Sequence, residues 1–360
     1  MYFTPVIAAS LSILLSTNSF AGDLSDMLQR MSDADLKQNY QGTFILRKSD
    51  NLSTLRVSHG SDDKGVWESL EALNGEPRKV IRRNNQVISV FPGRKLVTIR
   101  HAHKDQSLHP QLPANLDRLE LFYTINRLDD DRIANHQTLV VDLSPKDKLR
   151  YGYRYWVDKK TGMLLRCDLV AEDKTVVEQM MFTSLDYLTQ APAQSIELSQ
   201  FDQYEQQVFD EPKIQIKVQG VDGQSVAEQP VAEQQVGANK GAKTQWTVNR
   251  LPEGFMLTQH TMRYSQPVVI EKTNPSQKQL ADLLHLVYSD GLASVSVFIE
   301  KNKGVGNHLQ GVSTMGAINA FGNAVDGYFV TAVGEVPVRT VQSMAQSTVQ
   351  SSLQSTLREP

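Results

Sequence analysis

Short runs of β-forming residues, separated by Asn, Gly and Pro turns at intervals of about ten residues, constrain the fold of this chain more than any other feature of its sequence. In the first half of the chain the runs cover 42–46, 53–58, 65–73, 78–83, 86–91 and 95–100. The turns between them include Asn74-Gly75-Glu76-Pro77 and Pro92-Gly93. Strands at this spacing, joined by such turns, predict an antiparallel meander.

The clearest hairpin lies further along the chain, with strands over 151–157 and 163–170. Tyr151, Tyr153 and Tyr155 alternate along its first strand, so all three share one face of the sheet. These tyrosines either pack within the sheet or form an aromatic wall for an apolar ligand, and both interpretations stay open.

Helices are expected to be few. Apolar residues at helical spacing predict a helix over 23–39 and another after Pro337, and they allow one over 276–284. The period of 116–128 fits either a helix or a strand. Asp290-Gly291 is the two-residue signal of a tight hairpin. The sequence therefore predicts a mainly β protein of α+β type.

The chain has 360 residues, more than one hydrophobic core usually serves, and this predicts two domains. We expect an N-terminal domain over 22–217 and a smaller C-terminal α+β domain over 244–349. Residues 218–243 contain no aromatic residue and are rich in Gly, Gln and Ala, which is typical of a flexible linker. Residues 350–360 form a Ser/Gln-rich tail.

Residues 1–21 have the pattern of a secretory signal peptide. The uncharged apolar run 6–15 is shorter than the roughly 20 residues of a membrane span, and Ser19-Phe20-Ala21 forms a small-x-small cleavage pattern. We expect cleavage after Ala21 and a mature protein, not membrane-spanning, in the periplasm of a Gram-negative bacterium. The single cysteine, Cys167, is expected to be a small buried apolar group.

Signatures of catalysis are missing from the sequence. There is no G-x-S-x-G elbow. His101 and His103 lack a third ligand at a familiar spacing, so they indicate loop histidines. The acidic run 129–131 is expected to be a turn between strands. We therefore predict that the protein is not an enzyme and that it needs no metal or cofactor.

Charge is balanced overall but uneven locally. The formal net charge of −3 argues against a nucleic-acid-binding protein. Between positions 78 and 100, however, seven cations occur with no Asp or Glu: Arg78, Lys79, Arg82, Arg83, Arg94, Lys95 and Arg100. Arg forks suit phosphate or carboxylate, whereas charged strand faces also discourage edge-to-edge pairing. Anion binding and a solvated surface both stay open.

A long meander with few helices must close into a barrel or curl around a helix. A curled, open sheet leaves a concave apolar surface, the usual shape of a ligand cavity. An acyl chain gains ~0.8 kcal/mol for each buried CH₂ group. Such a cavity, rimmed by the seven cations, would suit an anionic amphiphile.

Several segments together resemble the RseB/MucB family of periplasmic sigma-E regulators. They include Leu139-Val-Val-Asp-Leu-Ser-Pro-Lys-Asp147, Arg150-Tyr151-Gly152-Tyr153-Arg154-Tyr155-Trp156, Trp246-Thr-Val-Asn-Arg-Leu-Pro252-Glu-Gly254-Phe255 and His285-Leu-Val-Tyr-Ser-Asp-Gly-Leu292. The similarity runs through both expected domains in the same order. It labels no individual contact residue.

The resemblance implies an unclosed β-barrel like those of the lipoprotein carriers LolA and LolB, with helices in its concavity, followed by a smaller antiparallel-sheet domain with flanking helices. It also implies a partner, the periplasmic region of an inner-membrane anti-sigma factor of the RseA or MucA type. The protein would shield that partner from site-1 proteolysis, and lipopolysaccharide or another acylated amphiphile would release it.

A periplasmic lipoprotein or lipid carrier using the same concave sheet is the alternative function. The second domain favours the regulator, because a simple carrier needs only one domain.

Overall fold

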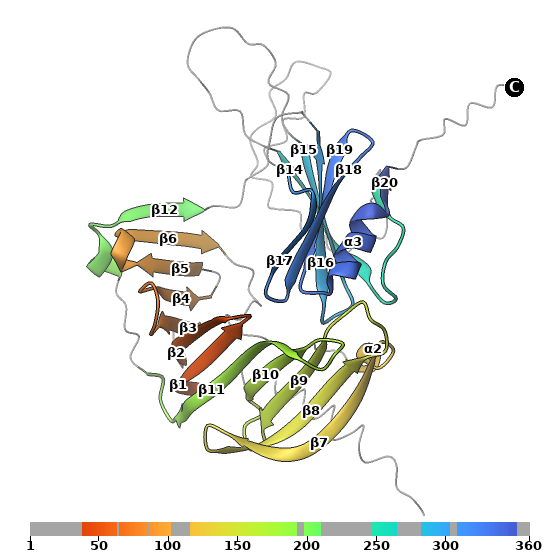
Figure 1. Ribbon diagram of the computed structural model, residues 1–360. Helices are drawn as coiled ribbons and strands as arrows, with labels where there is room; N and C mark the ends of the chain where they lie inside the picture. The colour runs from red at the N-terminus through yellow and green to blue at the C-terminus, as the bar shows by residue number, and fades with distance from the viewer. Residues whose placement is uncertain are drawn as a thin grey trace, which may run out of the picture.

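The computed structural model describes residues 38–62, 65–84, 86–101, 116–192, 198–209, 246–264, 282–302 and 308–350. These residues form two large sheets, one of 12 strands and one of six, each with its own hydrophobic core, and a third sheet of two strands. Figure 1 shows the larger sheet curving beneath and beside the smaller one. The predicted mainly β class is confirmed, and so is the unclosed larger sheet.

The larger sheet carries the N-terminal domain and consists of two meanders. Its strands are β1 (Asn39–Lys48), β2 (Asn51–Asp62), β3 (Gly65–Ala72), β4 (Lys79–Arg83), β5 (Gln86–Phe91), β6 (Leu96–His101), β7 (Tyr123–Ile133), β8 (His136–Pro145), β9 (Gly152–Asp158), β10 (Leu164–Val170), β11 (Val176–Leu188) and β12 (Glu205–Phe209). Pairing of β1 with β11 joins the two meanders, β1–β6 and β7–β11. At the ends of the sheet lie β7 and β12, so it does not close. The exception to the antiparallel pattern is β12, which runs parallel to β6.

The ambiguous segment 116–128 contains both kinds of structure. The short helix α2 (Leu116–Leu119) is followed by a turn over 120–122 and then by β7. The expected turn at 129–131 is wrong, because these residues continue β7 across a register irregularity between Leu128 and Asp131. The chain reverses instead at Ala134 and Asn135, which both have positive φ (46° and 68°). Lys159 and Arg127 pair with Asp130, so an acidic run is stable on this exposed edge strand.

The segments of two expected helices, 23–39 and 276–284, lie largely outside the described residues. Residues 23–37 lie outside the described residues, and β1 begins at Asn39. Asp282 already begins a strand, so the end of the helix allowed over 276–284 is wrong, while 276–281 lies outside the described residues. Leu284 and Leu286 are buried and Leu283 and His285 are only half-buried, which is the alternation of a strand.

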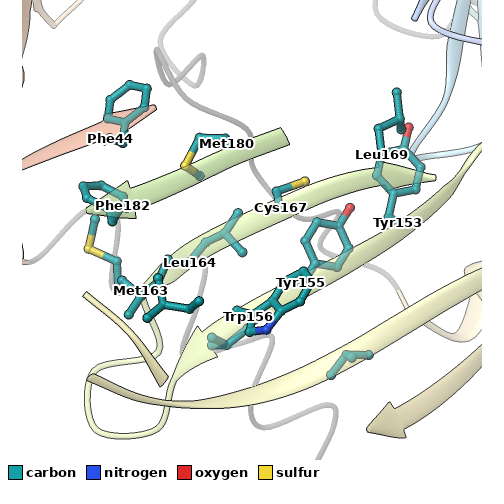
Figure 2. Packing of buried hydrophobic residues seen from close by; sticks show 14 of the residues in the cluster. Phe44, Tyr153, Tyr155, Trp156, Met163, Leu164, Cys167, Leu169, Met180 and Phe182 are labelled. Atoms are coloured by element: carbon teal, nitrogen blue, oxygen red, sulfur yellow. The ribbon is translucent and has the colours of Figure 1, made fainter. Parts of the chain in front are cut away.

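The larger sheet has an inner face, which we define by Tyr40, Phe44, Tyr153 and Tyr155. These side chains belong to one buried cluster with Cys167, Met180 and Phe182. Figure 2 shows the packing of all of these except Tyr40. On the opposite face, cross-strand neighbours Asp142, Arg154, Asp168 and Gln179 form a polar row. Alternation of apolar and polar residues along β8–β11 therefore sets which face is buried.

The smaller sheet carries the C-terminal domain. Its strands are β14 (Met256–Tyr264), β15 (Asp282–Ser289), β16 (Ser294–Lys301), β17 (Gly311–Met315), β18 (Ile318–Val325) and β19 (Tyr328–Gly334), in the order β14-β15-β16-β19-β18-β17. A separate pair is formed by β13 (Trp246–Val248) and β20 (Thr348–Gln350). The helix predicted after Pro337 is confirmed as α3 (Val338–Gln346), which buries Val341, Met344 and Ala345 in the core of this domain.

Candidate functional site

The two domains meet at an interface built around Arg150, which we call the interdomain joint. Its side chain is fully buried, and so is that of Asp290 in the C-terminal domain. Arg150 donates from Nη1 to Asp290 Oδ2 at 2.5 Å and from Nη2 to the carbonyl oxygen of Glu253 at 2.7 Å. Within its own domain it donates from Nη2 to Asp147 Oδ2 at 2.8 Å. A buried charge is costly unless it is paired and hydrogen-bonded, and here both domains supply the partners.

Aromatic side chains enclose this ion pair. The guanidinium carbon of Arg150 lies 5.3 Å from the ring centroids of Phe122 and Phe255 and 5.6 Å from that of Tyr123. Tyr123 donates its hydroxyl to Asp290 Oδ2 at 3.3 Å. Burial, and then the charge of Asp290, raise the pKa of the Tyr123 hydroxyl, so it stays protonated and remains a donor. The Arg150 charge is thus held between rings from both domains.

Asp290 is fixed by its own hairpin turn as well. Its Oδ1 accepts the backbone N–H groups of Leu292 and Ala293 at 2.9 and 2.8 Å. The hairpin predicted at Asp290-Gly291 does form, but its connection covers 290–293 rather than two residues. The same carboxylate reaches across to the N-terminal domain through its second oxygen.

A second group of contacts lies at the turn between β17 and β18. The Glu178 carboxylate on β11 accepts the backbone N–H of Ala317 at 3.1 Å and pairs with Lys48 at 3.0 Å. Asn319 donates to the Tyr151 hydroxyl at 3.1 Å. Ala317 is fully buried within the core cluster of the N-terminal domain. This turn is therefore inserted into the larger sheet's core rather than resting on its surface.

The start of α3 completes the joint. Thr340 donates its hydroxyl to the carbonyl oxygen of Leu149 at 2.6 Å, and Arg339 pairs with Glu172 at 2.9 Å. The Arg339 and Glu172 side chains are about half exposed, so that pair contributes little stability. Buried hydrogen bonds and the buried ion pair hold the domains together.

Glu335, beside the joint, gives the stability of the protein a dependence on pH. Burial, and then the Glu178 charge, raise the pKa of the Glu335 carboxyl, while Lys48 acts against them. Because this pKa is raised in the folded state, stability falls as pH rises through the raised value. Glu335→Gln removes the cost of holding an ionised carboxylate in this buried place. We therefore expect the variant to be more stable than the parent at about pH 7 and the gain in stability to shrink at about pH 4.

Urea unfolding at the two pH values measures this effect. Glu120→Gln, at an exposed position, is the control and should not show it. A Glu335→Gln variant that is less stable than the parent at neutral pH would contradict the assignment.

The three candidate tyrosines share one face but lie in two environments. Tyr153 and Tyr155 are buried on the inner face, with ring centroids 5.9 Å apart and planes within 7° of parallel. Tyr151 lies just before β9 and belongs to the joint through Asn319. Burial raises the pKa of all three hydroxyls. An aromatic ligand wall on this face would be made by Tyr153 and Tyr155.

Cys167 packs beside these rings as a small buried group, as predicted. Burial, and then the Asp168 charge, raise the pKa of its thiol, which suppresses the reactive thiolate. We expect no reaction with a thiol reagent at neutral pH in the native protein and full reaction after unfolding. Leu52→Cys places a thiol at a side chain that is 53% exposed and should react at once. Rapid native labelling in the protein that carries Cys167 alone would show that the inner face opens.

Strand alternation divides the seven candidate cations instead of gathering them into one patch. Arg82 and Arg100 lie on the inner face, in the cross-strand row Tyr40, His59, Glu68, Arg82, Val87, Arg100 and Phe209. Lys79 and Arg83 lie on the opposite face of β4, because they alternate with Arg82. Arg78, Arg94 and Lys95 lie in the connections before β4 and between β5 and β6.

Acidic partners missing from this stretch of sequence come from other strands and turns. Arg83 pairs with Asp62 at 2.8 Å, and Arg94 pairs with Glu76 at 2.6 Å. The guanidinium carbon of Arg100 lies 4.9 Å from the Phe209 ring centroid. Sequence reasoning could not see these partners, because an excess of charge along the chain is not an excess of charge in space.

No group of His, Cys, Asp and Glu that could hold a metal ion occurs within the part of the chain that the structure describes. His101 ends β6, and His103 lies outside that part. Among the same residues, no helix is both long and apolar enough to cross a membrane.

The fold and the joint define a class of protein: a curved, unclosed β-sheet domain with an apolar inner face, joined to a smaller β-sheet domain by buried contacts. Comparison with known proteins names the family. Residues 23–201 match the MucB/RseB N-terminal domain, and residues 240–349 match the MucB/RseB C-terminal domain. The chain belongs to the MucB/RseB family.

Individual relatives agree over almost the whole chain. The sigma factor AlgU regulatory protein MucB of Pseudomonas aeruginosa is 30% identical over 91% of this chain and 91% of its own length. The sigma-E factor regulatory protein RseB of Haemophilus influenzae is 25% identical, covering 94% of this chain and 96% of its own. These relatives are named as regulatory proteins, which confirms the prediction that the chain is not an enzyme.

A solved relative supports the same assignment in three dimensions. A chain in the complex structure of Pseudomonas aeruginosa MucA/MucB superposes with a TM-score of 0.60 and 26% identity, covering 91% of this chain and 99% of that chain. The match spans both domains of the chain.

Proposed function

We propose that the protein is a periplasmic negative regulator of sigma-E activity. In this role it binds the periplasmic region of an inner-membrane anti-sigma factor of the RseA or MucA type and shields that region from site-1 proteolysis. The observation that carries the proposal is the family match through both domains, together with a relative of the same fold in complex with MucA. The signal-peptide pattern of residues 1–21 supports the periplasmic location.

A regulator can bind its partner with both domains, whereas a simple lipid carrier needs only one. Contacts from both domains to one extended peptide raise the effective concentration of each for the other. Edge strands such as β7 and β17 are where a peptide strand could add. While the joint is formed, it holds these elements at one spacing, so the partner meets a surface that is already arranged.

The release signal in this proposal is lipopolysaccharide or another acylated amphiphile. The inner face combines apolar side chains with Arg82 and Arg100, which suits acyl chains together with a phosphate. For an amphiphile to release the partner, the two ligands must differ in their affinity for the same surface or the same domain arrangement.

Paired substitutions test the inner-face cations. Arg82→Gln with Arg100→Gln should weaken binding of lipopolysaccharide by about tenfold or more at low salt, because hydrogen bonds to charged groups contribute ~1.5–3 kcal/mol each. Lys79→Gln with Lys95→Gln, outside the inner face, is the matched control and should leave the affinity close to that of the parent. Equal losses from both pairs would reject a specific role for the inner face.

The function itself is tested by binding in solution. The purified mature chain is titrated with the periplasmic segment of the single-span anti-sigma factor encoded beside it, with and without lipopolysaccharide. We expect saturable binding that lipopolysaccharide reverses. Capture of a broad set of acylated lipoproteins from envelope extract, without the anti-sigma segment, would instead support the lipid-carrier alternative.

A further inference from the structure

We infer that the Arg150–Asp290 ion pair forms and breaks reversibly and so gives the two domains a closed state and an open state. We call this ion pair the catch. The second part of this inference rests on the proposed function: the anti-sigma segment binds the closed state more tightly, so opening the catch lowers the affinity for it.

The case for a catch begins with burial. Both side chains are 0% exposed, and their charged atoms lie 2.5 Å apart across the joint. The pair is therefore shielded from salt far better than the half-exposed Arg339–Glu172 pair at the other side of the joint. A slight separation would break the Arg150–Asp290 ion pair while both groups are still buried, which costs more than either full closure or full exposure. Intermediate arrangements are thus disfavoured, and a joint of this kind has two states.

The case for reversibility rests on what each half keeps when the domains part. Arg150 keeps Asp147, which lies in the same loop and is 32% exposed. Asp290 keeps the backbone N–H groups of Leu292 and Ala293 within its own turn. Each charged group therefore retains a partner in its own domain. These local partners lower the cost of separating the two charges, so the joint can open and close again.

The remaining contacts fit the same interpretation. The other bonds to Arg150 and Asp290 that cross the joint have a charge on one partner only: Arg150 donates to the Glu253 carbonyl, and the Tyr123 hydroxyl donates to Asp290. Asn319 with Tyr151 and Thr340 with Leu149 are also single hydrogen bonds. Water can replace each of these after opening. Arg150 with Asp290 is the buried contact of the joint in which both partners carry a full charge, so it sets the two-state behaviour.

Distance measurements between two labels on the full mature chain test the catch. Val208→Cys on β12 and Val312→Cys on β17 place labels at side chains that are 56% and 49% exposed, one in each domain. Cys167 is buried and does not compete for the label. The parent should give one narrow distance distribution. Asp290→Asn and Arg150→Met should each add a population at a different distance.

Matched variants keep the result interpretable. Arg154→Met removes an arginine that pairs with Asp142 on the same sheet at 2.8 Å but faces away from the joint, and it should leave the distribution unchanged. Asp290→Asn keeps the Oδ1 acceptor for the two backbone N–H groups, so the decision rests on this variant even if Arg150→Met fails to fold. A folded Asp290→Asn variant with the parent's distribution would overturn the catch.

Binding of the anti-sigma segment tests the coupling separately. Asp290→Asn should bind the segment about tenfold or more weakly, since a binding-competent state that is less populated lowers the apparent affinity in proportion. An altered distance distribution with unchanged affinity would overturn the coupling while the catch stands. If the parent itself does not bind the segment, the proposed function fails, and the distance result still decides the catch.

Discussion

Gly254→Ala should destabilise the protein strongly, because this glycine lies at the joint with a backbone that other residues rarely adopt. Its φ is +84°, and a Cβ built there would lie well within 3.0 Å of the Phe122 ring. The backbone conformation costs ~1–3 kcal/mol for a residue with a side chain. Moving Phe122 adds an overpacking cost of ~1–3 kcal/mol, since that ring packs against Arg150.

Gly327→Ala separates the two costs. Gly327 has a φ of +81° in the turn between β18 and β19, and nothing lies within 4 Å of a Cβ built there. Urea unfolding of both variants should therefore show a larger loss for Gly254→Ala, and the difference measures the contact between Gly254 and Phe122. Equal losses would mean that the two domains do not pack closely at this turn.

Leu286→Ala should cost about 2–5 kcal/mol of stability, the usual range for truncating a buried leucine. Leu286 is 0% exposed on β15, and it packs in the core cluster that also contains Val295, Val297 and Met344. Because buried contacts join the domains, destabilising the C-terminal domain should also lower the unfolding midpoint seen by probes in the N-terminal domain.

Val312→Ala is the matched control for this change. Val312 lies on β17 of the same sheet and is 49% exposed, so its truncation should change stability by no more than about 0.5 kcal/mol. Two fully separate unfolding transitions, with only one moved by Leu286→Ala, would contradict the cooperative joint.

The strands of this fold could be predicted because turn residues and alternation mark them locally. Residues 86–91 were expected as a strand and form β5 (Gln86–Phe91), and Pro337 marks the start of α3. The acidic run 129–131 misled because charge is typical of turns, yet an edge strand with one solvated side also tolerates it. Local pattern thus predicts element type well and edge strands less well.

The candidate site could be predicted only in part, because alternation shows which residues share a strand face but not how the strands pair. Alternation placed Tyr151, Tyr153 and Tyr155 on one face without the structure. It also divides the cations, but the register between strands was needed to show that Arg82 and Arg100 share the inner face. Arg150 and Asp290 are 140 positions apart, and a single sequence holds no signal that brings them together. Asp290 is an ordinary hairpin residue in the sequence, and only its burial against Arg150 makes it part of the interdomain joint.

Protection of the anti-sigma factor is the most direct test of the proposed regulator. The periplasmic segment of the anti-sigma factor is incubated with site-1 protease, with and without the mature protein, and cleavage is followed over time. The account predicts that the protein keeps the segment intact and that added lipopolysaccharide restores cleavage. Cleavage at the same rate with and without the protein, under conditions in which the protein is folded, would contradict it.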